Sequence, residues 1–352
     1  MKDNLSVNMA IDMGTSNTRI YVKDKGVVVV EPTMVARIKR KQWVGLGAPQ
    51  KKQGAVVAWG TKAKEMLNRE PQQVEVVSPL KNGIIFDLEM AQRLIANYIK
   101  MVYEIPTKYP KIIKPLMVVG LPTNISKVQK RAIRTIMLEA GAVEVILVDQ
   151  GVAAAIGLGV SMEKRAGMVI VDVGGGKTEV SVVSMGGVVI GRMINCGGIE
   201  ADNSIINYIR MKYGLLIGQN TAERLKIEMG DKMLVRGRDL EKGLPKSIKV
   251  SKNEIIEAEA SVVNKISRLV KEVLDETPPE LMEDVLKRGV ALVGGACRMK
   301  NLAEIISRET NIGVNVVDDA ELAVVMGLGE LLNNPKLLEK VKMISGYVHR
   351  AR

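Results

Sequence analysis

Two glycine-rich turns of one design stand in the two halves of this chain, and each follows an apolar strand that ends in an aspartate. The first follows Asp12 and consists of Gly14, Thr15, Ser16 and Asn17. The second follows Asp172 and consists of Gly174, Gly175 and Gly176. Such turns offer backbone N–H groups to a phosphate, and a nearby carboxylate attracts a hydrated divalent cation. One turn is typical of an ordinary hairpin. Two favour a nucleoside triphosphate clamped between related domains.

Composition indicates a soluble globular protein. Of its residues, 47% are hydrophobic and 26% are charged. Its length of 352 residues is enough for two domains with full cores. The chain has two cysteines, Cys196 and Cys297, far apart in the sequence, which indicates a protein of the reducing cytosol. We expect both to be buried as small apolar side chains. The N-terminal residues are too short and polar for a signal peptide, and no apolar run approaches the ~20 residues that span a bilayer.

The net charge of +12 raises the question of an anionic partner. Aromatic residues are only 3% of the chain, and they do not alternate with basic residues as in proteins that stack single strands. The positive charge is spread along the chain, which is typical of a solvated surface. Among functional alternatives, attraction to anionic lipid is favoured, and no nucleic acid is expected.

The order of predicted elements repeats in the two halves, and strands that alternate with helices indicate an α/β protein. In the first half the strands are expected over 8–31, 116–119 and 145–148, and the helices over 87–103, 126–140 and 152–158. In the second half hairpin strands are expected over 168–193, followed by a helix from 201, a long helix over 254–275, strands at 291–296 and 314–317 and a closing helix over 321–333. Val27–Val30 is expected to be a buried strand. Two related domains would leave a ligand cleft between them.

Together with a third glycine turn at Gly294, these features resemble the actin-like ATPase superfamily. The resemblance to its bacterial MreB family covers about residues 8–334 and includes the segments Ser78–Gly83, Ala153–Gly157, Asn220–Glu228, Val235–Leu240 and Thr277–Leu281. The implied fold has duplicated actin-like, ribonuclease H-like domains with two small inserted subdomains around a nucleotide cleft. The expected boundaries are 1–31 and 75–150 for subdomain IA, 32–74 for IB, 151–205 and 254–334 for IIA, 206–253 for IIB, and 335–352 for a basic C-terminal tail.

The resemblance also implies a set of site residues for ATP and Mg²⁺. Residues 14–17 would hold one side of the phosphates and residues 174–176 the other. The nucleoside would meet Glu223, Arg224, Leu225 and Lys226, and a last segment would close over the base and α-phosphate, namely Gly294, Gly295, Ala296, Cys297 and Arg298. Asp12 and Asp172 would organise Mg²⁺ through water. Without the resemblance, Glu223 and Lys226, three apart on a predicted helix, would equally suit a surface ion pair.

The chain departs from the family at the positions that activate water. Its turn Asp149-Gln150-Gly151 has Gln150 where the family has a glutamate, and Lys177 follows the triple glycine where the family has a threonine. An amide can orient water but cannot take a proton. Lys177 either pairs with the γ-phosphate or turns to solvent or to a carboxylate such as Asp149. Both positions are expected to face the cleft, and weak hydrolysis follows from either alternative.

Two segments are candidates for contact with an anionic membrane. In Ile105–Pro115, Tyr109, Ile112 and Ile113 are interleaved with lysines, although a plain helix-to-strand connection with buried isoleucines fits equally. The basic C-terminal tail is amphipathic, and its alternative is a solvated, fraying end.

The sequence thus predicts a cytoplasmic actin-like protein, peripheral to the inner face of the cell membrane. It would bind ATP and polymerise with itself into filaments that support cell shape, or motility in a wall-less cell. Other actin-like proteins are further candidate partners. The alternative is a nucleotide-binding structural adaptor of low or no activity that co-assembles with other actin-like filaments. A metabolite kinase would need a substrate pocket with an acidic base, and a chaperone would need a peptide-binding domain.

Overall fold

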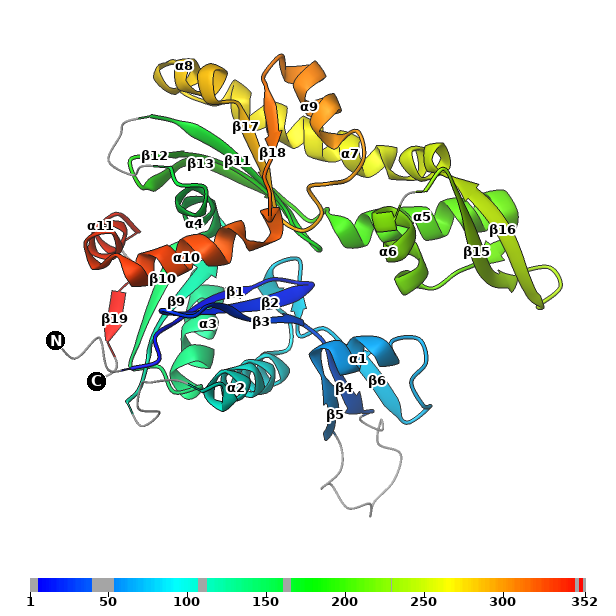
Figure 1. Cartoon of the computed structure of the whole chain (residues 1–352), viewed down its shortest axis with the longest axis horizontal. Coiled ribbons are helices and arrows are strands. Elements are labelled where there is room, and N and C mark those ends of the chain that lie inside the picture. Colours follow the sequence, from blue (N-terminus) through cyan, green and yellow to red (C-terminus); the bar gives the residue numbers. More distant parts are fainter. Residues whose placement is uncertain are drawn as a thin grey trace. The chain divides into compact units, whose positions relative to one another are not determined.

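The computed structural model of the chain describes residues 6–39, 54–106, 113–160, 166–228, 230–345 and 348–350. The chain divides into two compact units. Figure 1 shows it coloured by sequence position, from blue at the N-terminus to red at the C-terminus. Unit 1 consists of Met1–Ser161 and Val324–Arg352, and unit 2 consists of Met162–Ala323.

Unit 1 is built on a six-stranded sheet. Its order is β19-β10-β9-β1-β2-β3, for β1 (Met9–Met13), β2 (Asn17–Val22), β3 (Gly26–Pro32), β9 (Leu116–Leu121), β10 (Glu144–Asp149) and β19 (Val348–Arg350). The first three strands form an antiparallel meander, while β9 and β10 run parallel to β1. The first glycine-rich turn is therefore the connection between β1 and β2.

Helices lie on both faces of this sheet. On one face α2 (Leu88–Glu104) and α3 (Lys127–Glu139) share a core with alternate β9 residues such as Met117 and Val119. The opposite face carries α4 (Gln150–Gly157) and α10 (Ala323–Asn333), as Figure 1 shows. Helix α3 begins where the sequence predicts, because the Ser126 hydroxyl accepts the Gln129 N–H at 3.2 Å. Such a cap contributes about 1 kcal/mol.

A smaller sheet follows β3 in the chain. It has the order β5-β4-β6, formed by β4 (Val35–Ile38), β5 (Val56–Trp59) and β6 (Val74–Val77), with α1 (Gly60–Met66) beside it. A two-stranded ribbon, β7 (Leu80–Lys81) and β8 (Ile84–Ile85), leads into α2. Strands β4 and β5 and helix α1 lie within residues 32–74, where the sequence predicts a small insert, whereas β6 begins at its last residue and β7 and β8 follow it.

Unit 2 repeats the sheet of unit 1. Its order is β13-β12-β11-β17-β18, for β11 (Met168–Val173), β12 (Thr178–Ser184), β13 (Gly187–Ile194), β17 (Val290–Val293) and β18 (Val314–Val316). Again three antiparallel strands are followed by two parallel ones. The duplication seen in the sequence is therefore a duplication of topology.

The remaining elements of unit 2 surround this sheet and build a second small one. The helices are α5 (Gly198–Tyr213), α6 (Gln219–Glu228), α7 (Lys252–Asp275), α8 (Pro279–Arg288), α9 (Leu302–Thr310) and the short 3₁₀ helix η2 (Ala320–Leu322). The small sheet has the order β14-β15-β16, for β14 (Leu215–Leu216), β15 (Lys232–Asp239) and β16 (Pro245–Ser251). Helix α7 starts at a capping box between Ser251 and Glu254.

Two local expectations need correction. The run Val27–Val30 is not a buried strand, because β3 is the edge of its sheet and Val30 is 53% exposed. The C-terminal segment is not a fraying end: residues 335–345 form α11 (Pro335–Ser345), and β19 pairs with β10. Leu338 and Val341 of α11 are buried, and Lys342 forms an ion pair with Glu144 at 3.2 Å. Part of the apolar surface of this segment is therefore buried inside unit 1, while Met343 and Ile344 are exposed.

Candidate nucleotide-binding site

The first glycine turn is closed by the backbone of its own hairpin. The Gly14 N–H donates to the Asn17 carbonyl at 3.1 Å, and a Cβ at Gly14 would lie 2.6 Å from that oxygen. Only glycine fits such a close approach. Thr33 donates its hydroxyl to the Gly14 carbonyl at 2.7 Å, and Thr15 accepts the Gly83 N–H at 2.8 Å. The Thr33 side chain, which directly follows β3, and the backbone of the β7–β8 connection thus contact this turn.

The second glycine turn has the same closure in unit 2. The Gly174 N–H donates to the Lys177 carbonyl at 2.9 Å. The turn is also tied to the start of α5, because the Gly198 and Ile199 N–H groups donate to the carbonyls of Gly174 and Gly175 at 3.0 and 2.8 Å. The second glycine turn is therefore joined by backbone hydrogen bonds to the N-terminus of a 16-residue helix.

Asp12 is held from two sides within unit 1. The Gln150 amide nitrogen donates to one carboxylate oxygen at 2.9 Å, and an Arg19 guanidinium nitrogen lies 3.4 Å from the other. Gln150 is only 4% exposed. The amide that was expected to face the cleft and orient water is thus buried against the aspartate that was expected to organise Mg²⁺. Asp149 precedes Gln150 at the end of β10 and is half-buried.

Lys177 is buried in an ion pair with Glu179. Its ammonium lies 2.6 Å from a carboxylate oxygen of Glu179, and the two side chains are 9% and 1% exposed. The Ser181 hydroxyl donates to the other oxygen at 3.3 Å. The carboxylate that Lys177 contacts at this distance is that of Glu179, and sequence reasoning missed this partner.

The third glycine turn packs against the second aspartate. Gly294, at the end of β17, has a φ of +87°, and a Cβ there would lie 2.3 Å from a carboxylate oxygen of Asp172. Gly295 and Arg298 are exposed, whereas Ala296 and Cys297 are buried. Burial raises the pKa of the Cys297 thiol to about 12, so this side chain stays neutral.

The predicted nucleoside segment lies on α6. Lys226 donates to an Asp202 carboxylate oxygen at 2.6 Å and to the Gly198 carbonyl at 2.9 Å. Glu223 is half-buried and Arg224 is exposed, while the Leu225 side chain belongs to the apolar core. A Cβ on Gly198 would contact the Lys226 ammonium and the Ala296 Cβ, at 3.3 and 3.2 Å. The start of α5 thus brings α6 and the third turn together in unit 2.

A buried carboxylate lies close to this cluster and was not predicted as a functional residue. Glu259, on α7, is 0% exposed, and neither of its carboxylate oxygens has a hydrogen-bond partner in the described part of the chain. Burial raises its pKa to about 7; the Lys226 ammonium opposes this shift and the Asp202 carboxylate adds to it. Glu259 therefore carries a proton over part of the neutral range.

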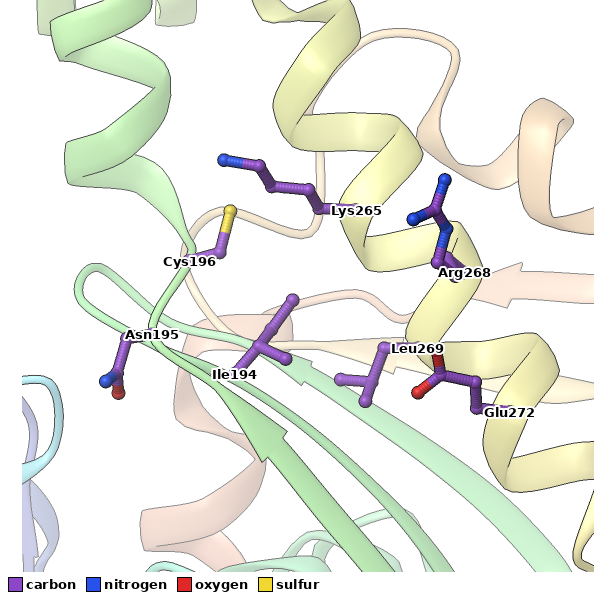
Figure 2. Close-up of a pocket in the computed structure, with 7 residues that line it drawn as sticks. All are labelled: Ile194, Asn195, Cys196, Lys265, Arg268, Leu269 and Glu272. Atoms are coloured by element: carbon purple, nitrogen blue, oxygen red, sulfur yellow. The ribbon is translucent and has the colours of Figure 1, made fainter.

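Figure 2 shows a separate pocket of about 270 Å³ between β13 and α7. It is lined by Ile194, Asn195, Cys196, Lys265, Arg268, Leu269 and Glu272. It contains none of the residues that the sequence predicts for the nucleotide. Its connection to the second turn is the Cys196 carbonyl, which accepts the Thr178 hydroxyl at 2.7 Å.

The described residues contain no group of three or more His, Cys, Asp or Glu side chains placed to bind a metal ion. Within the same residues, no helix is long and apolar enough to cross a membrane. Most of the predicted membrane loop Ile105–Pro115, namely residues 107–112, lies outside the described part. Ile113 is 37% exposed, and Pro115 is buried.

Comparisons with known proteins agree with this architecture. A family model described as MreB/Mbl protein matches residues 6–340. The cell shape-determining protein MreB of Escherichia coli strain K12 is 38% identical over 349 residues, which cover 97% of this chain and 96% of the relative. The cell shape-determining protein Mbl of Bacillus subtilis strain 168 is 35% identical over 344 residues, with 96% and 98% covered.

Solved structures of one relative extend the comparison to the fold. Crystal structures of MreB5 of Spiroplasma citri, bound to ADP and to AMPPNP, match with a TM-score of 0.84 and 28% identity. The match covers 96% of this chain and 98% of MreB5. It confirms the actin-like α/β fold that the sequence predicts.

Proposed function

This chain belongs to the MreB/Mbl family, and on that premise we propose that it binds ATP and polymerises into cytoskeletal filaments. These filaments would support cell shape, or motility in a wall-less cell. The observation that carries the proposal is the repeated hairpin, with Asp12 and Asp172 at equivalent registers beside two turns of the same closure. An open polymer needs only a head-to-tail contact whose rotation does not close.

Nucleotide binding is supported by both turns and by the relative MreB5, whose structures hold ADP and AMPPNP. In our proposal residues 14–17 and 174–176 contact the phosphates through backbone N–H groups. Glu223, Arg224 and Lys226 contribute to the nucleoside side, while Leu225 contributes by its backbone because its side chain is in the core. The backbone of Gly294–Arg298 completes the set.

Mg²⁺ fits this site only as an ion held through water and through the phosphates of the nucleotide. Asp12 and Asp172 both stand beside a turn, but no complete protein ligand set exists among the described residues. When bound, the ion would neutralise charge on the phosphates. The protein's own residues then have to bind and orient the nucleotide.

Hydrolysis is proposed to be slow. Gln150 uses its amide nitrogen on Asp12, and Lys177 uses its ammonium on Glu179. Neither side chain can act as a base toward water, since an amide has no suitable pKa and an ammonium has no lone pair. Both pairs therefore favour a filament in which ATP persists.

The same two pairs favour the alternative function, a nucleotide-binding adaptor of low or no activity that co-assembles with other actin-like filaments. The two functions differ in whether the chain polymerises alone. In either case we propose a cytoplasmic location, with peripheral membrane contact through Ile105–Pro115 or the exposed end of α11. Met343 and Ile344 at that end are 80% and 48% exposed.

The decisive experiment measures polymer and phosphate together. We expect purified chain with ATP and Mg²⁺ to pellet and to form filaments in electron micrographs while phosphate release is slow. In Gln150→Glu/Lys177→Thr/Glu179→Gln, whose third exchange removes the carboxylate left buried without Lys177, release should rise ~100-fold if each group acts as a usual general-base contributor, in protein that a melting curve shows to be folded. Filaments that appear only with a second actin-like protein would favour the adaptor. Absence of nucleotide binding would reject both functions.

A further inference from the structure

Arg19 places a positive charge inside the first phosphate hairpin. It lies on β2 directly across from Asp12 on β1 in the antiparallel register. The two side chains are 11% and 8% exposed, and the guanidinium nitrogen lies 3.4 Å from the Asp12 carboxylate. Cross-strand neighbours of opposite charge attract each other, and partial burial strengthens that attraction because it weakens the screening by water.

The second hairpin has no equivalent cation at this register. There the residue across from Asp172 is Glu179, whose charge is balanced by Lys177 from the turn itself. The cation at the first hairpin is thus directed at the aspartate, whereas the cation at the second hairpin is directed at a neighbouring glutamate. Only the first aspartate has its charge compensated by its cross-strand partner.

The hydrogen bonding of Asp12 points in the same direction. One of its oxygens accepts the Gln150 amide and the other faces Arg19, so each oxygen already has a donor from the protein. The Arg19 Nε atom is buried without a hydrogen-bond partner in the described part of the chain. The guanidinium is therefore held by the place of Arg19 on β2 and by its attraction to the Asp12 carboxylate.

We propose that Arg19 is a built-in counter-ion for Asp12 that lowers the need for a divalent cation when nucleotide binds. This inference rests on the proposed nucleotide site. An ionised aspartate near the polyphosphate repels it, and a divalent cation would normally screen that repulsion. Because Arg19 already neutralises Asp12, ATP without Mg²⁺ meets less repulsion at the first turn. Arg19 acts through Asp12 and is a positioning residue.

The test compares nucleotide affinity with and without Mg²⁺. Binding of a fluorescent ATP analogue to the full chain is measured in EDTA and in saturating Mg²⁺, and the ratio of the two Kd values is taken. For the wild type we expect the Kd in EDTA to be at most about ten times the Kd in Mg²⁺. In Arg19→Met the ratio should rise at least about tenfold, because a partly buried charge pair is worth a decade or more. Arg19→Lys should stay near the wild type.

Two further variants separate this effect from misfolding and from net charge. Asp12→Asn/Arg19→Met removes the carboxylate together with its counter-ion, so the Mg²⁺ dependence gained in the single variant should disappear. Lys100→Met removes an exposed cation of α2 and should leave the ratio unchanged. Thermal melting of each variant establishes that it is folded.

The outcomes distinguish this inference from the function on which it rests. If the wild type binds nucleotide and Arg19→Met has the same ratio as the wild type, the counter-ion role is wrong while the nucleotide site stands. The same conclusion follows if the double variant keeps the increased ratio. If the wild type binds no nucleotide in either condition, the proposed function and this inference fail together.

Discussion

The ammonium of Lys177 lies 2.6 Å from a carboxylate oxygen of Glu179, and both side chains are almost completely buried in unit 2. Lys177 directly precedes β12 and Glu179 is the second residue of that strand, so the two side chains, two positions apart, project to the same side. Ser181 continues that face and donates to the same carboxylate. The cation at the end of the second glycine turn is thereby paired with a carboxylate of the strand that follows it.

Replacing Lys177 with threonine is expected to destabilise the fold. Lys177→Thr leaves the Glu179 carboxylate buried without its cation, and the loss of one partner of a buried pair costs about 3–5 kcal/mol. Urea unfolding measures the change in free energy. Lys177→Thr/Glu179→Gln should recover most of the loss, since it removes the uncompensated charge. Equal stability of wild type and single variant would show that the pair contributes nothing.

Replacing Gln150 with glutamate is expected to destabilise unit 1, and more so at higher pH. In Gln150→Glu a carboxylate replaces the amide that donates to Asp12 at 2.9 Å, so two carboxylates share one site. The folded variant then holds a proton more tightly than the unfolded chain, and its stability falls as pH rises. We expect a loss of about 1–3 kcal/mol at pH 8.

Thermal or urea unfolding at pH 5.5 and pH 8 checks this result. Gln150→Met serves as the matched control, because it removes the hydrogen-bond donor to Asp12 without adding a charge. Its loss of unfolding free energy should be the same at pH 5.5 and at pH 8. A pH-independent loss in Gln150→Glu would mean that Arg19 fully absorbs the second negative charge. Stability is at stake at positions 150 and 177 because both side chains are buried, although the sequence led us to expect that they face the cleft.

Glu259 is expected to make stability depend on pH near neutrality. Burial raises its pKa from 4.5 to about 7, so the folded chain keeps a proton that the unfolded chain releases. Its contribution is therefore complete below about pH 4.5 and is lost as pH rises through about 7. A shift of this size corresponds to about 3 kcal/mol.

The difference in unfolding free energy between wild type and Glu259→Gln isolates this contribution from other carboxylates. As the pH rises from 4.5 to 8, the unfolding free energy of Glu259→Gln should increase by about 3 kcal/mol relative to that of the wild type. Its dependence on pH over this range should be flatter. Parallel curves for the two proteins would exclude Glu259 as the responsible group.

Gly327 is expected to tolerate no side chain. A Cβ at this position on α10 would lie 1.8 Å from the Ala153 carbonyl oxygen on α4, so Gly327→Ala forces the two helices of unit 1 apart. Such overpacking costs about 1–3 kcal/mol or more. Gly313→Ala is the control, because no atom lies within 4 Å of its Cβ position and its stability should change by less than about 0.5 kcal/mol. Melting temperatures of the two variants give the comparison.

What the sequence predicts well is local. The hairpins follow from an apolar strand that ends in aspartate and a glycine-rich turn, and the start of α3 follows from one capping serine, so these elements lie where they are expected. The Lys177–Glu179 pair was also within reach, since residues two apart on a strand share a face. The exposure of Val30 could not be predicted, because an apolar run does not show whether a strand lies in the centre or at the edge of a sheet.

What the sequence does not predict depends on contacts between distant segments. Gln150 and Asp12 are 138 positions apart, and they meet only because β10, β9 and β1 are neighbours in one sheet. Lys226 and Asp202 meet only after α5 and α6 pack together. Glu259 interrupts the apolar stripe of α7, and this was a visible signal for an unusual buried carboxylate.

The path of the chain has a consequence for synthesis on the ribosome. Unit 1 contains both the first residues of the chain and the last, since α11 and β19 return to β10, whereas unit 2 is one continuous segment. Domains usually fold as units during translation, with the N-terminal one first. Here the order is reversed: unit 2 has all its residues while unit 1 still lacks the edge strand of its sheet. The sheet of unit 1 is therefore completed only after α11 and β19 have been synthesised, by which time every residue of unit 2 is available for folding.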